Sequence, residues 1–536
     1  MKPLVQAFFR KLESILDLTG CNSPGGQIGC AVALVVLGVR LLMLQGFGYQ
    51  VPYWDEWVVD AGQLFKPLRE GNFDPHVLLA LHNEHRIFWT RLIALGAFKV
   101  AGRWDPLFEQ VFDAIAFAAI VGICVSRVII ETGKVQLSIV VSAALFLVPF
   151  SYSNLLIGFQ TQFFLATLLA VSAFSLAAHG RPNLVRSLTL LLLCGASLLV
   201  NGSGIALPMV LVFTSAIRAI RDRGSRLALF PLIGGASVIT LIGLHFGSPI
   251  QKPSWSEGLT ALCRYFSWPE GNLLALVATP GSHQRYLPTF ARQMLEGGNL
   301  SAYSVFVTFL VGFLALLTFA PAFVAILQYV IGRSQAFAAM GSAWVALCAS
   351  AMALARSGES LVPPRYQDIL ILGLFFGAFV AGDWAHSPRR YLRWLGWSWF
   401  GGIGLALVLT AIGVVAIELP RKVAENRAAT RLIRSYLEKG DVKIFENQPP
   451  NHVPWPNGEK DLAVMLSDPT VRGLLPVCLY PDSERPAYSL ASRLLRGFVP
   501  LSAPIALGMG FSILYFACGR RRAPSGSEGK IPCQGT

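Results

Sequence analysis

Long apolar stretches recur along this chain, and most of them approach the roughly 20 residues that a helix needs to cross a bilayer. None alternates apolar and polar residues over about ten positions, as transmembrane β-strands do. The pattern therefore predicts an all-α, polytopic membrane protein with about twelve transmembrane helices. The expected spans are 28–48, 107–130, 135–150, 159–178, 187–201, 204–220, 228–246, 302–331, 335–355, 367–385, 395–418 and 498–518.

Some of these stretches are not simple spans. The third and fifth are short, and the sequence Asn201-Gly202-Ser203-Gly204 interrupts the apolar stretch 187–220. That stretch is either two full spans or a broken, re-entrant hairpin. A further apolar segment, 271–280, is too short to span and is expected to be re-entrant.

Composition agrees with a chain built for lipid. Hydrophobic residues make up 54% of its 536 residues and charged residues only 14%, whereas soluble proteins carry roughly 25% charged residues. The mean hydropathy is +0.55. These values exclude the series of soluble domains that the length alone would suggest.

Basic residues in the short loops all fall on one side of the expected membrane. The positive-inside rule makes that side cytoplasmic and places both termini there. The net charge of +14 then indicates topology and contact with anionic lipid, and it gives no reason to expect nucleic acid as a partner. The residues are Arg127, Lys134, Arg181, Arg186, Arg218, Arg221, Arg223, Arg226, Arg333, Arg389, Arg390, Arg393 and Arg520, Arg521 and Arg522.

The expected topology divides the chain into five parts. The first 27 residues do not resemble a cleavable signal peptide and are expected to form an amphipathic helix on the cytoplasmic leaflet. The soluble C-terminal segment is small, so it must lean on the membrane domain or on the first external loop for stability. The parts are the N-terminal segment 1–27, the membrane domain 28–418 with external loops 49–106 and 247–301, the extracytoplasmic segment 419–497, the last transmembrane helix 498–518 and the basic cytoplasmic tail 519–536.

An acidic pair, Asp55 and Glu56, stands among three aromatic residues at 53–57 in the first external loop. Apolar residues there follow helical spacing, which predicts a helix that lies flat on the outer leaflet and ends at Pro67. A carboxylate held there suits a general base, Asp55, with Glu56 as an orienting or metal-binding neighbour. The pair also fits an ordinary helix start, because acidic residues complement the helix dipole and aromatic residues favour the interface.

A second polar cluster, 82–86, precedes an apolar run. On a helix two of its histidines would share one face, and a histidine pair near carboxylates can ligate zinc or a hard divalent ion, although the spacing matches no strong zinc signature. A solvated helix end is the structural alternative. We prefer polar contacts that hold an active-site loop or that bind a diphosphate or sugar hydroxyls, made by His82, Glu84, His85 and Arg86.

Two short external links add polar side chains at the expected mouth of the bundle. Arg356, Arg365 and Tyr366 form one group, in which an arginine either holds a lipid phosphate or anchors the interface. Gln160 and Gln162, at the outer end of the fourth span, are placed to bind sugar hydroxyls or to bond neighbouring helices.

Two pairs of residues are expected to be linked. Arg40 and Asp113 fall at similar depths in the first and second spans, and a charge at such depth needs a partner, so we expect a structural ion pair between them. Cys263 and Cys478 are the two of nine cysteines that fall in external loops. They can form a disulfide if that compartment is oxidising.

With these features the chain resembles the GT-C superfamily of membrane glycosyltransferases, which use polyprenyl-phosphate-linked sugars on the outer face of the membrane. The resemblance lies in the acidic pair after the first span, the first external loop with its surface helix, the many spans and the external C-terminal segment. It covers about 28–420 in layout rather than in extended sequence, and it points to no specific branch. It implies Asp55 as catalytic base, Glu56 as its neighbour or substitute and Arg365 as a contact to the donor phosphate.

The implied reaction is transfer of a sugar to a lipid, glycan or protein acceptor at a bacterial cytoplasmic (inner) membrane, with inversion and with or without a divalent metal ion. A lipid-linked glycan polymerase or ligase, a secondary transporter and a non-catalytic assembly protein are the alternatives. Transporters usually carry internal repeats and place ionisable residues at the midplane, whereas this sequence has no visible repeat and its polar clusters lie outside. The sugar, the acceptor, the metal dependence and the oligomeric state stay open.

Overall fold

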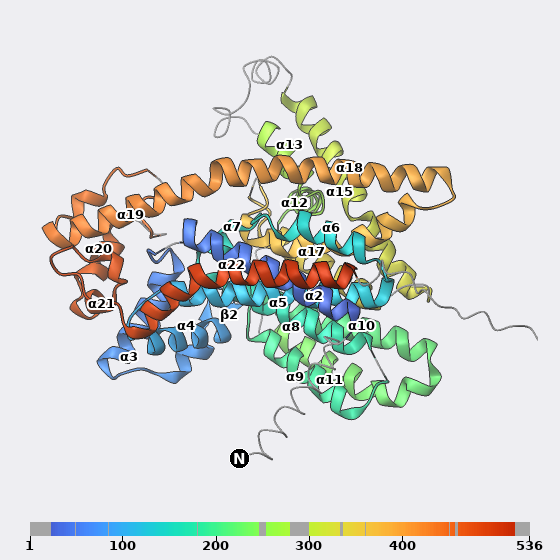
Figure 1. Ribbon diagram of the computed structural model, residues 1–536, viewed down its shortest axis with the longest axis horizontal. Helices are drawn as coiled ribbons and strands as arrows, with labels where there is room; N and C mark the ends of the chain where they lie inside the picture. The colour runs from blue at the N-terminus through green and yellow to red at the C-terminus, as the bar shows by residue number, and fades with distance from the viewer. Residues whose placement is uncertain are drawn as a thin grey trace, which may run out of the picture.

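Helices account for almost all regular structure in the computed structural model (Figure 1). It describes residues 23–48, 50–83, 85–179, 181–245, 253–278, 300–332, 336–359, 361–449, 451–455 and 459–519. Among these residues, ten helical stretches are long and apolar enough to cross a membrane, and two shorter apolar helices accompany them. The ten are built on α2 (Pro24–Phe47), α5 (Leu107–Thr132), α8 (Thr161–Ala178), α10 (Ala206–Arg221), α11 (Arg226–His245), α15 (Leu300–Val330), α16 (Ala336–Ala355), α17 (Pro364–Ala385), α18 (Arg390–Gly413) and α22 (Leu490–Gly519).

The predicted all-α, polytopic class is therefore confirmed. The two short expected spans, 135–150 and 187–201, correspond to the shorter helices α6 (Val135–Phe146) and α9 (Leu184–Leu198). The interruption predicted near Gly202 is present, since the 3-10 turn η4 (Gly202–Ile205) separates α9 from α10. The apolar segment 271–280 falls largely on α13 (Glu270–Ala278), a short helix that follows α12 (Trp255–Phe266).

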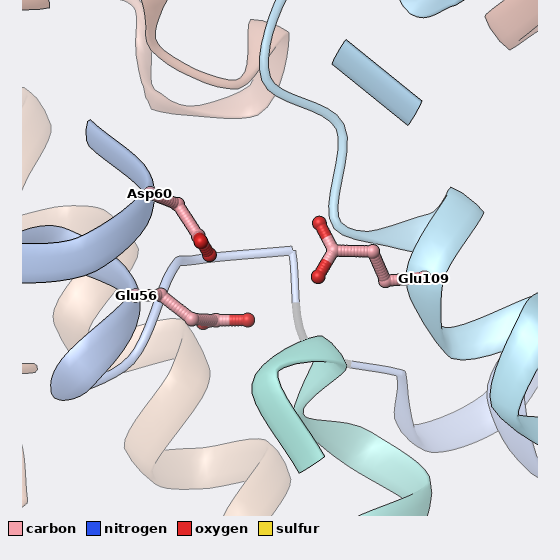
Figure 2. Close-up of side chains that lie close together, drawn as sticks. All are labelled: Glu56, Asp60 and Glu109. Atoms are coloured by element: carbon pink, nitrogen blue, oxygen red, sulfur yellow. The ribbon is translucent and has the colours of Figure 1, made fainter. Parts of the chain in front are cut away.

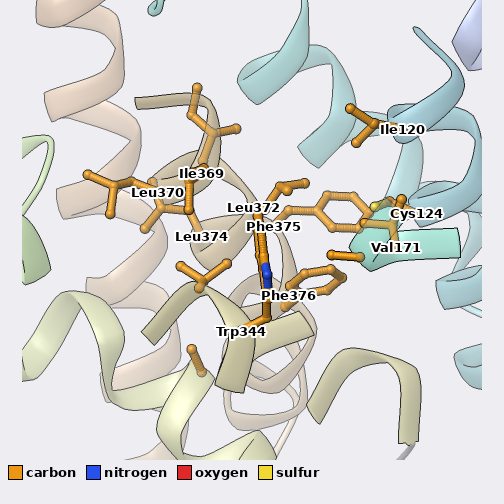
Figure 3. Packing of buried hydrophobic residues seen from close by; sticks show 14 of the residues in the cluster. Ile120, Cys124, Val171, Trp344, Ile369, Leu370, Leu372, Leu374, Phe375 and Phe376 are labelled. Carbon is orange, nitrogen blue, oxygen red and sulfur yellow. The ribbon is translucent and has the colours of Figure 1, made fainter. Parts of the chain in front are cut away.

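The interior of the bundle is organised around α17, in which 89% of the residues of an apolar 18-residue stretch are buried. Phe375 and Phe376 of this helix lie in one buried cluster with Trp344 of α16 (Figure 3). A side chain at Gly341 would come within 2.2 Å of the Phe376 ring, so this helix crossing needs a residue without a side chain. Because lipid supplies no hydrophobic force between helices, such close packing is what holds the bundle together.

One continuous helix links the bundle to the structure outside it. Helix α18 continues through the π turn η7 (Val414–Glu418) into α19 (Leu419–Lys439), a run of 50 residues. At 1.5 Å per residue it spans roughly 75 Å, more than twice the ~30 Å thickness of the hydrocarbon core. The polar second half must therefore leave the membrane. Pro420 does not end this helix, and it closely follows the irregular π turn η7.

Two segments far apart in the sequence, 51–104 and 419–479, form one unit outside the bundle, which we call the cap (Figure 1, left). Its hydrophobic core takes Trp57 and Phe65 from the first segment and Ile433 and Leu466 from the second. The small C-terminal segment therefore packs against the first loop, one of the two supports expected for it. Besides α19, the cap contains η1 (Trp57–Phe65), α3 (Lys66–Glu70), η2 (Pro75–Leu79), α4 (Phe88–Ala101), η8 (Val442–Phe445), α20 (Glu459–Ser467), α21 (Pro469–Leu474) and η9 (Val477–Leu479).

The helix after the acidic pair differs from its prediction in two ways. Its apolar stripe does not face lipid: Trp57 and Leu64 are fully buried in the cap core, because the second segment covers them. The helix also continues past Pro67 to Glu70, as the π-helix η1 followed by α3. Pro67 falls in the first turn of α3, where its missing N–H costs little.

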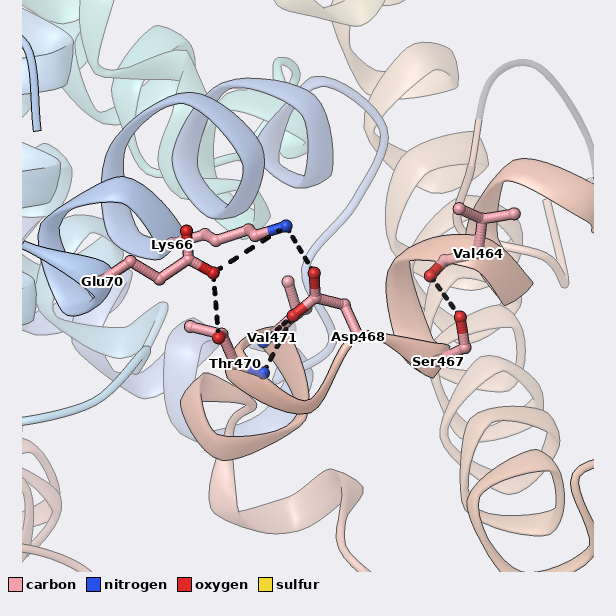
Figure 4. Close-up of polar contacts among 7 residues, drawn as sticks. All are labelled: Lys66, Glu70, Val464, Ser467, Asp468, Thr470 and Val471. Atoms are coloured by element: carbon pink, nitrogen blue, oxygen red, sulfur yellow. Dashed lines mark hydrogen bonds and ion pairs between the residues drawn. The ribbon is translucent and has the colours of Figure 1, made fainter. Parts of the chain in front are cut away.

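Polar contacts join the two segments at the surface of the cap (Figure 4). Lys66 forms an ion pair with Asp468, and the Thr470 hydroxyl donates to the Glu70 carboxylate over 3.0 Å. Asp468 also caps α21, because one of its oxygens accepts from the Thr470 N–H at 2.8 Å and from the Val471 N–H at 3.2 Å. Exposed pairs of this kind contribute little energy, so the shared hydrophobic core carries most of the stability.

Truncating a side chain in that core tests this assignment. Ile433→Ala should destabilise the cap by about 2–5 kcal/mol, because it removes buried methyl groups and leaves a cavity. Val464→Ala is the matched control, since Val464 of α20 is 68% exposed. We expect a lower midpoint of thermal unfolding in detergent, and faster limited proteolysis, for the first variant alone. Equal behaviour of the two variants would contradict a core shared by the two segments.

Candidate functional site

The backbone turns sharply just before Asp55. Trp54 adopts a left-handed conformation with φ of 52°, which is costly for a bulky residue and persists only where the surroundings enforce it. The Trp54 N–H donates to the Pro454 carbonyl over 3.0 Å, and the Trp57 indole N–H donates to the Pro52 carbonyl over 2.8 Å. The second segment of the cap thus fixes the turn that presents Asp55.

Asp55 lines a cavity of about 280 Å³ at the junction of the cap and the bundle. Its side chain is 41% exposed. Four parts of the chain meet there: the turn before η1, the segment of α7 (Tyr152–Leu156) and η3 (Gly158–Gln160), the start of α17, and α19. The cavity brings together three residues singled out from the sequence, namely Asp55, Gln160 and Arg365.

Two positively charged side chains, those of Arg365 and Lys422, line this cavity. Arg365 lies 3.6 Å from Glu359, measured from Nη2 to Oε1, and its guanidinium stands 5.1 Å from the centre of the Tyr366 ring. Lys422 of α19, which the sequence did not indicate, lies 2.6 Å from Glu425, measured from Nζ to Oε2. Each pairs with a carboxylate that does not line the cavity, so both can still meet an anion inside it.

Other residues of the predicted group lie behind the cavity or beside it. The Arg356 Nε donates to the Tyr366 hydroxyl over 3.3 Å, and neither residue lines the cavity. Gln162 is buried on α8, where its backbone carbonyl accepts from the Asn201 amide at 3.5 Å. The Gln160 side-chain oxygen, in contrast, is buried without a hydrogen-bond partner among the described residues. Gln160 as a residue lines the cavity, but this oxygen has almost no accessible surface.

The histidine cluster forms a β-hairpin, so the expected helix is wrong. Strands β1 (Leu81–His82) and β2 (His85–Arg86) pair with His82 opposite His85. Asn83 takes the left-handed conformation, with φ of 50°, that such a tight turn requires and that asparagine tolerates. Glu84 lies outside the described residues.

The two histidines of the hairpin lie against different parts of the protein. His82 Nε2 lies 3.6 Å from Asp55 Oδ2, and its ring meets Phe159 edge-on at 5.4 Å. His85 instead lies against Gly202 in the turn between α9 and α10. Neither His85 nor Arg86 lines the cavity. Of the predicted cluster, His82 alone is brought to the candidate base among the residues described.

Glu56 points away from the cavity into the protein. Its carboxylate accepts from the Tyr53 N–H at 2.5 Å and from the Phe159 N–H at 3.3 Å. Burial, opposed by these hydrogen bonds, raises the pKa of Glu56 to about 7. The side chain therefore ties the start of η1 to η3, which is a positioning role.

Glu56, Asp60 and Glu109 form a buried carboxylate cluster whose oxygens lie within 4.8 Å of one another (Figure 2). Both oxygens of Asp60 are buried without a hydrogen-bond partner among the described residues, as is Oε2 of Glu109. The turn at η3 comes close to this cluster because Gly158 has no side chain; a Cβ there would lie 2.7 Å from Glu109 Cβ.

A repeated spacing in the sequence accompanies this cluster. Glu56, directly before η1, is four residues from Asp60 of η1, and Glu109 and Asp113 are four residues apart on α5. At that spacing the two members of each pair lie on the same side of their helix. The repeated Glu-x-x-x-Asp pattern was the available signal, and the sequence analysis missed it.

The donor set of the cluster fits a hard divalent cation, since Mg²⁺ and Ca²⁺ prefer carboxylate oxygens. Three buried carboxylates cannot all stay charged without compensation, so the cluster either takes up protons or holds a cation. Arg91 of α4 is buried close by, but its guanidinium donates to the carbonyls of Val77 and Ala80 and to the Gln63 side chain.

The intramembrane ion pair differs from the one expected. Arg40 Nη2 lies 3.6 Å from Asp368 Oδ1 of α17, and its guanidinium stands 3.4 Å from the centre of the Phe117 ring. Asp113 accepts a hydrogen bond from the Thr161 hydroxyl at 2.7 Å instead. The need for a partner was correctly inferred, but the partner comes from α17, which packs at the centre of the bundle.

The expected disulfide is also wrong. Cys263 and Cys478 are both free. Cys263 lies on α12 near Gly312 of α15, whereas Cys478 lies in η9 with its sulfur 3.6 Å from the Gln50 carbonyl. Packing assigns the two cysteines to separate structural units, the bundle and the cap.

Comparison of the chain with protein-family models, with curated proteins and with solved structures finds no match in any of the three.

The carboxylate cluster predicts how stability depends on pH. Burial, together with repulsion from Glu109 and Glu56, raises the pKa of Asp60 well above its usual range. Between the ordinary carboxyl pKa and this raised value the folded state binds more protons than the unfolded state, so stability falls as pH rises. The wild-type unfolding midpoint should therefore drop between pH 5 and pH 8. Asp60→Asn should drop less and be the more stable at pH 8.

Glu438→Gln, at an exposed position on α19, is the control and should follow the wild type. Added Mg²⁺ or Ca²⁺ distinguishes the two ways in which the charge of the cluster can be compensated, namely uptake of protons and binding of a cation. A rise of the wild-type midpoint at pH 8 that is lost in Asp60→Asn would indicate a bound cation. Parallel pH profiles for wild type and Asp60→Asn, without any response to cation, would rule out both uptake of protons and binding of a cation by the cluster.

Proposed function

We propose that this protein is a membrane glycosyltransferase, which moves a sugar from a polyprenyl-phosphate donor to a lipid, glycan or protein acceptor. One observation carries the proposal: a half-exposed carboxylate and two cations line a single cavity where the cap meets the bundle. A base for the acceptor and positive charge for the departing phosphate are what such a transfer needs. Because the bundle lies in the membrane, the lipid tail of the donor has direct access to the junction of the cap and the bundle, where the cavity lies.

Four of the residues that line the cavity have roles in this reaction. Asp55 takes the proton of the acceptor hydroxyl as that oxygen attacks the anomeric carbon. Arg365 and Lys422 bind the phosphate of the donor in the ground state and keep that contact as the phosphate departs with its negative charge. Gln160, which lines the cavity, offers its side-chain amide group to a sugar hydroxyl. A single displacement of this kind inverts the anomeric centre and needs no covalent intermediate.

Two neighbours of Asp55 act through position. His82, at 3.6 Å, orients the Asp55 carboxylate. Glu56 holds the turn through its two backbone hydrogen bonds, so we assign it no contact with substrate. If the cluster behind the turn holds a divalent cation, Glu56, Asp60 and Glu109 are its ligands, and the ion would add positive charge near the turn.

We place the protein in a bacterial cytoplasmic (inner) membrane, with the cap and its cavity on the outer face. Basic residues lie in the α10–α11 and α17–α18 links, and α10 and α17 each run from the cap side to the opposite end of the bundle. The positive-inside rule makes that opposite end cytoplasmic, which supports this orientation.

The base is tested by Asp55→Asn. The glycans and glycolipids of host cells that produce the protein should carry a sugar that is absent from cells without it, as measured by mass spectrometry. Asp55→Asn should reduce that sugar by a factor of about 10² to 10⁴, the usual contribution of a general base. The control is Asp461→Asn, an exposed carboxylate elsewhere in the cap. Full modification by Asp55→Asn at normal expression would refute the assignment.

The phosphate contact is tested by Arg365→Gln. With purified protein and a panel of short-chain polyprenyl-phosphate hexoses and pentoses, this change should raise the donor KM by roughly 10- to 100-fold, which corresponds to a charge-assisted hydrogen bond of about 1.5–3 kcal/mol. Arg427→Gln, an exposed arginine of α19, should leave the donor KM unchanged. A loss of kcat alone, at constant donor KM, would argue against binding of the ground-state phosphate by Arg365.

A further inference from the structure

A second cavity lies at the end of the bundle opposite the cap. Its volume is about 300 Å³, and it forms where α8, α9, α10, α11, α15 and α16 converge. Three arginines line it: Arg186 of α9, and Arg218 and Arg221 of α10. Deeper apolar residues such as Leu190 and Leu232 complete the wall. The cavity thus combines a basic part with an apolar part.

The arginines are held in place although their charges repel. Arg218 disfavours the charge of Arg186 by repulsion. Arg186 Nη1 donates to the Arg181 carbonyl over 2.9 Å, and the Arg221 guanidinium stands 5.2 Å from the centre of the Tyr329 ring. Neither Arg186 nor Arg221 makes an ion pair with a carboxylate of the described chain.

One carboxylate lines the cavity, that of Asp222. Its oxygens accept from the Gly224 N–H at 3.1 Å and from the Ser225 hydroxyl. Because Arg186 and Arg221 make no ion pair with this or any other described carboxylate, their positive charge faces the cavity. An anion with several oxygens, such as a phosphate ester, is the natural complement of such a site.

The surroundings of the cavity indicate where that anion comes from. Apolar side chains on α9 and α11 are turned outward, with Leu192 75% exposed and Leu227 83% exposed. Faces of this kind contact lipid tails in a membrane protein. A phospholipid can therefore place its headgroup among the arginines while its acyl chains lie along these helices. Basic pockets between membrane helices on the cytoplasmic side bind anionic headgroups in this way.

We propose that this second cavity binds the phosphate headgroup of an anionic phospholipid. The site is independent of the cavity at Asp55 and lies at the other end of the bundle. It requires no chemistry, since the arginines bind the phosphodiester by charge and by hydrogen bonds.

The test measures binding of phosphatidylglycerol to the purified, full-length protein in zwitterionic phosphatidylcholine nanodiscs. Native mass spectrometry counts the bound lipids, and thermal unfolding follows the stabilisation that they cause. The variant Arg186→Gln/Arg221→Gln should weaken binding of phosphatidylglycerol by about thirtyfold, the factor expected from two basic residues at about 1 kcal/mol each. The control is Arg390→Gln/Arg393→Gln, two exposed arginines of α18 at the same end of the bundle.

Each outcome decides the proposal. A loss confined to the cavity variant supports it. Equal losses in both double variants would indicate nonspecific surface charge and overturn it. Stabilisation by glycerol 3-phosphate equal to that by phosphatidylglycerol would identify a soluble phosphate as the ligand and also overturn it. If the double variant does not fold in phosphatidylcholine alone, Arg221→Gln replaces it, because Arg221 is exposed and its truncation disturbs little packing.

Discussion

The candidate site depends on a hydrophobic core that neither of its two contributing segments could form alone. Residues 51–104 supply an amphipathic π-helix and α4, and residues 419–479 supply the end of a very long helix and four short ones. Each segment has an apolar side that is too large to expose to water. Their union buries Trp57 and Phe65 against Ile433 and Leu466, and it also holds the left-handed turn at Trp54 through the Pro454 carbonyl. The orientation of Asp55 is therefore a consequence of cap folding.

The same union explains why acidic residues are arranged in two layers. At the surface of the cavity, Asp55 keeps partial contact with water and has His82 beside it. Behind it, Glu56, Asp60 and Glu109 are excluded from water and crowd together. Asp55 and Glu56 are consecutive in the chain, yet the first can exchange protons with a substrate whereas the second belongs to a cluster that needs a proton or a cation to remain buried. This separation makes Asp55, and not Glu56, the residue suited to general-base chemistry.

Most of the architecture could be predicted from hydropathy, because the bilayer imposes a length and a composition on every helix that crosses it. The helical class, the two short apolar helices and the break near Gly202 follow from that constraint alone. The acidic pair and Arg365 were also found from the sequence, since charged residues beside aromatic or rigid ones stand out in a chain with so few charges. Lys422 was missed because it lies in a charged helix where one lysine looks like any other.

Contacts between segments distant in the sequence were decided by the tertiary structure. The apolar stripe at 57–65 is compatible with lipid or with protein, and only the second segment of the cap shows that it faces protein. Arg40 needed an acidic partner, but the choice of Asp368 over Asp113 depends on which helix packs against α2. His82 and His85 pair across a hairpin because Asn83 turns the chain, and local pattern could not separate that turn from a helix. The sequence by itself determined which segments enter the membrane, because that depends on the composition of each segment alone. The partner of each buried charge depends on helix packing, which has no local signature in the chain.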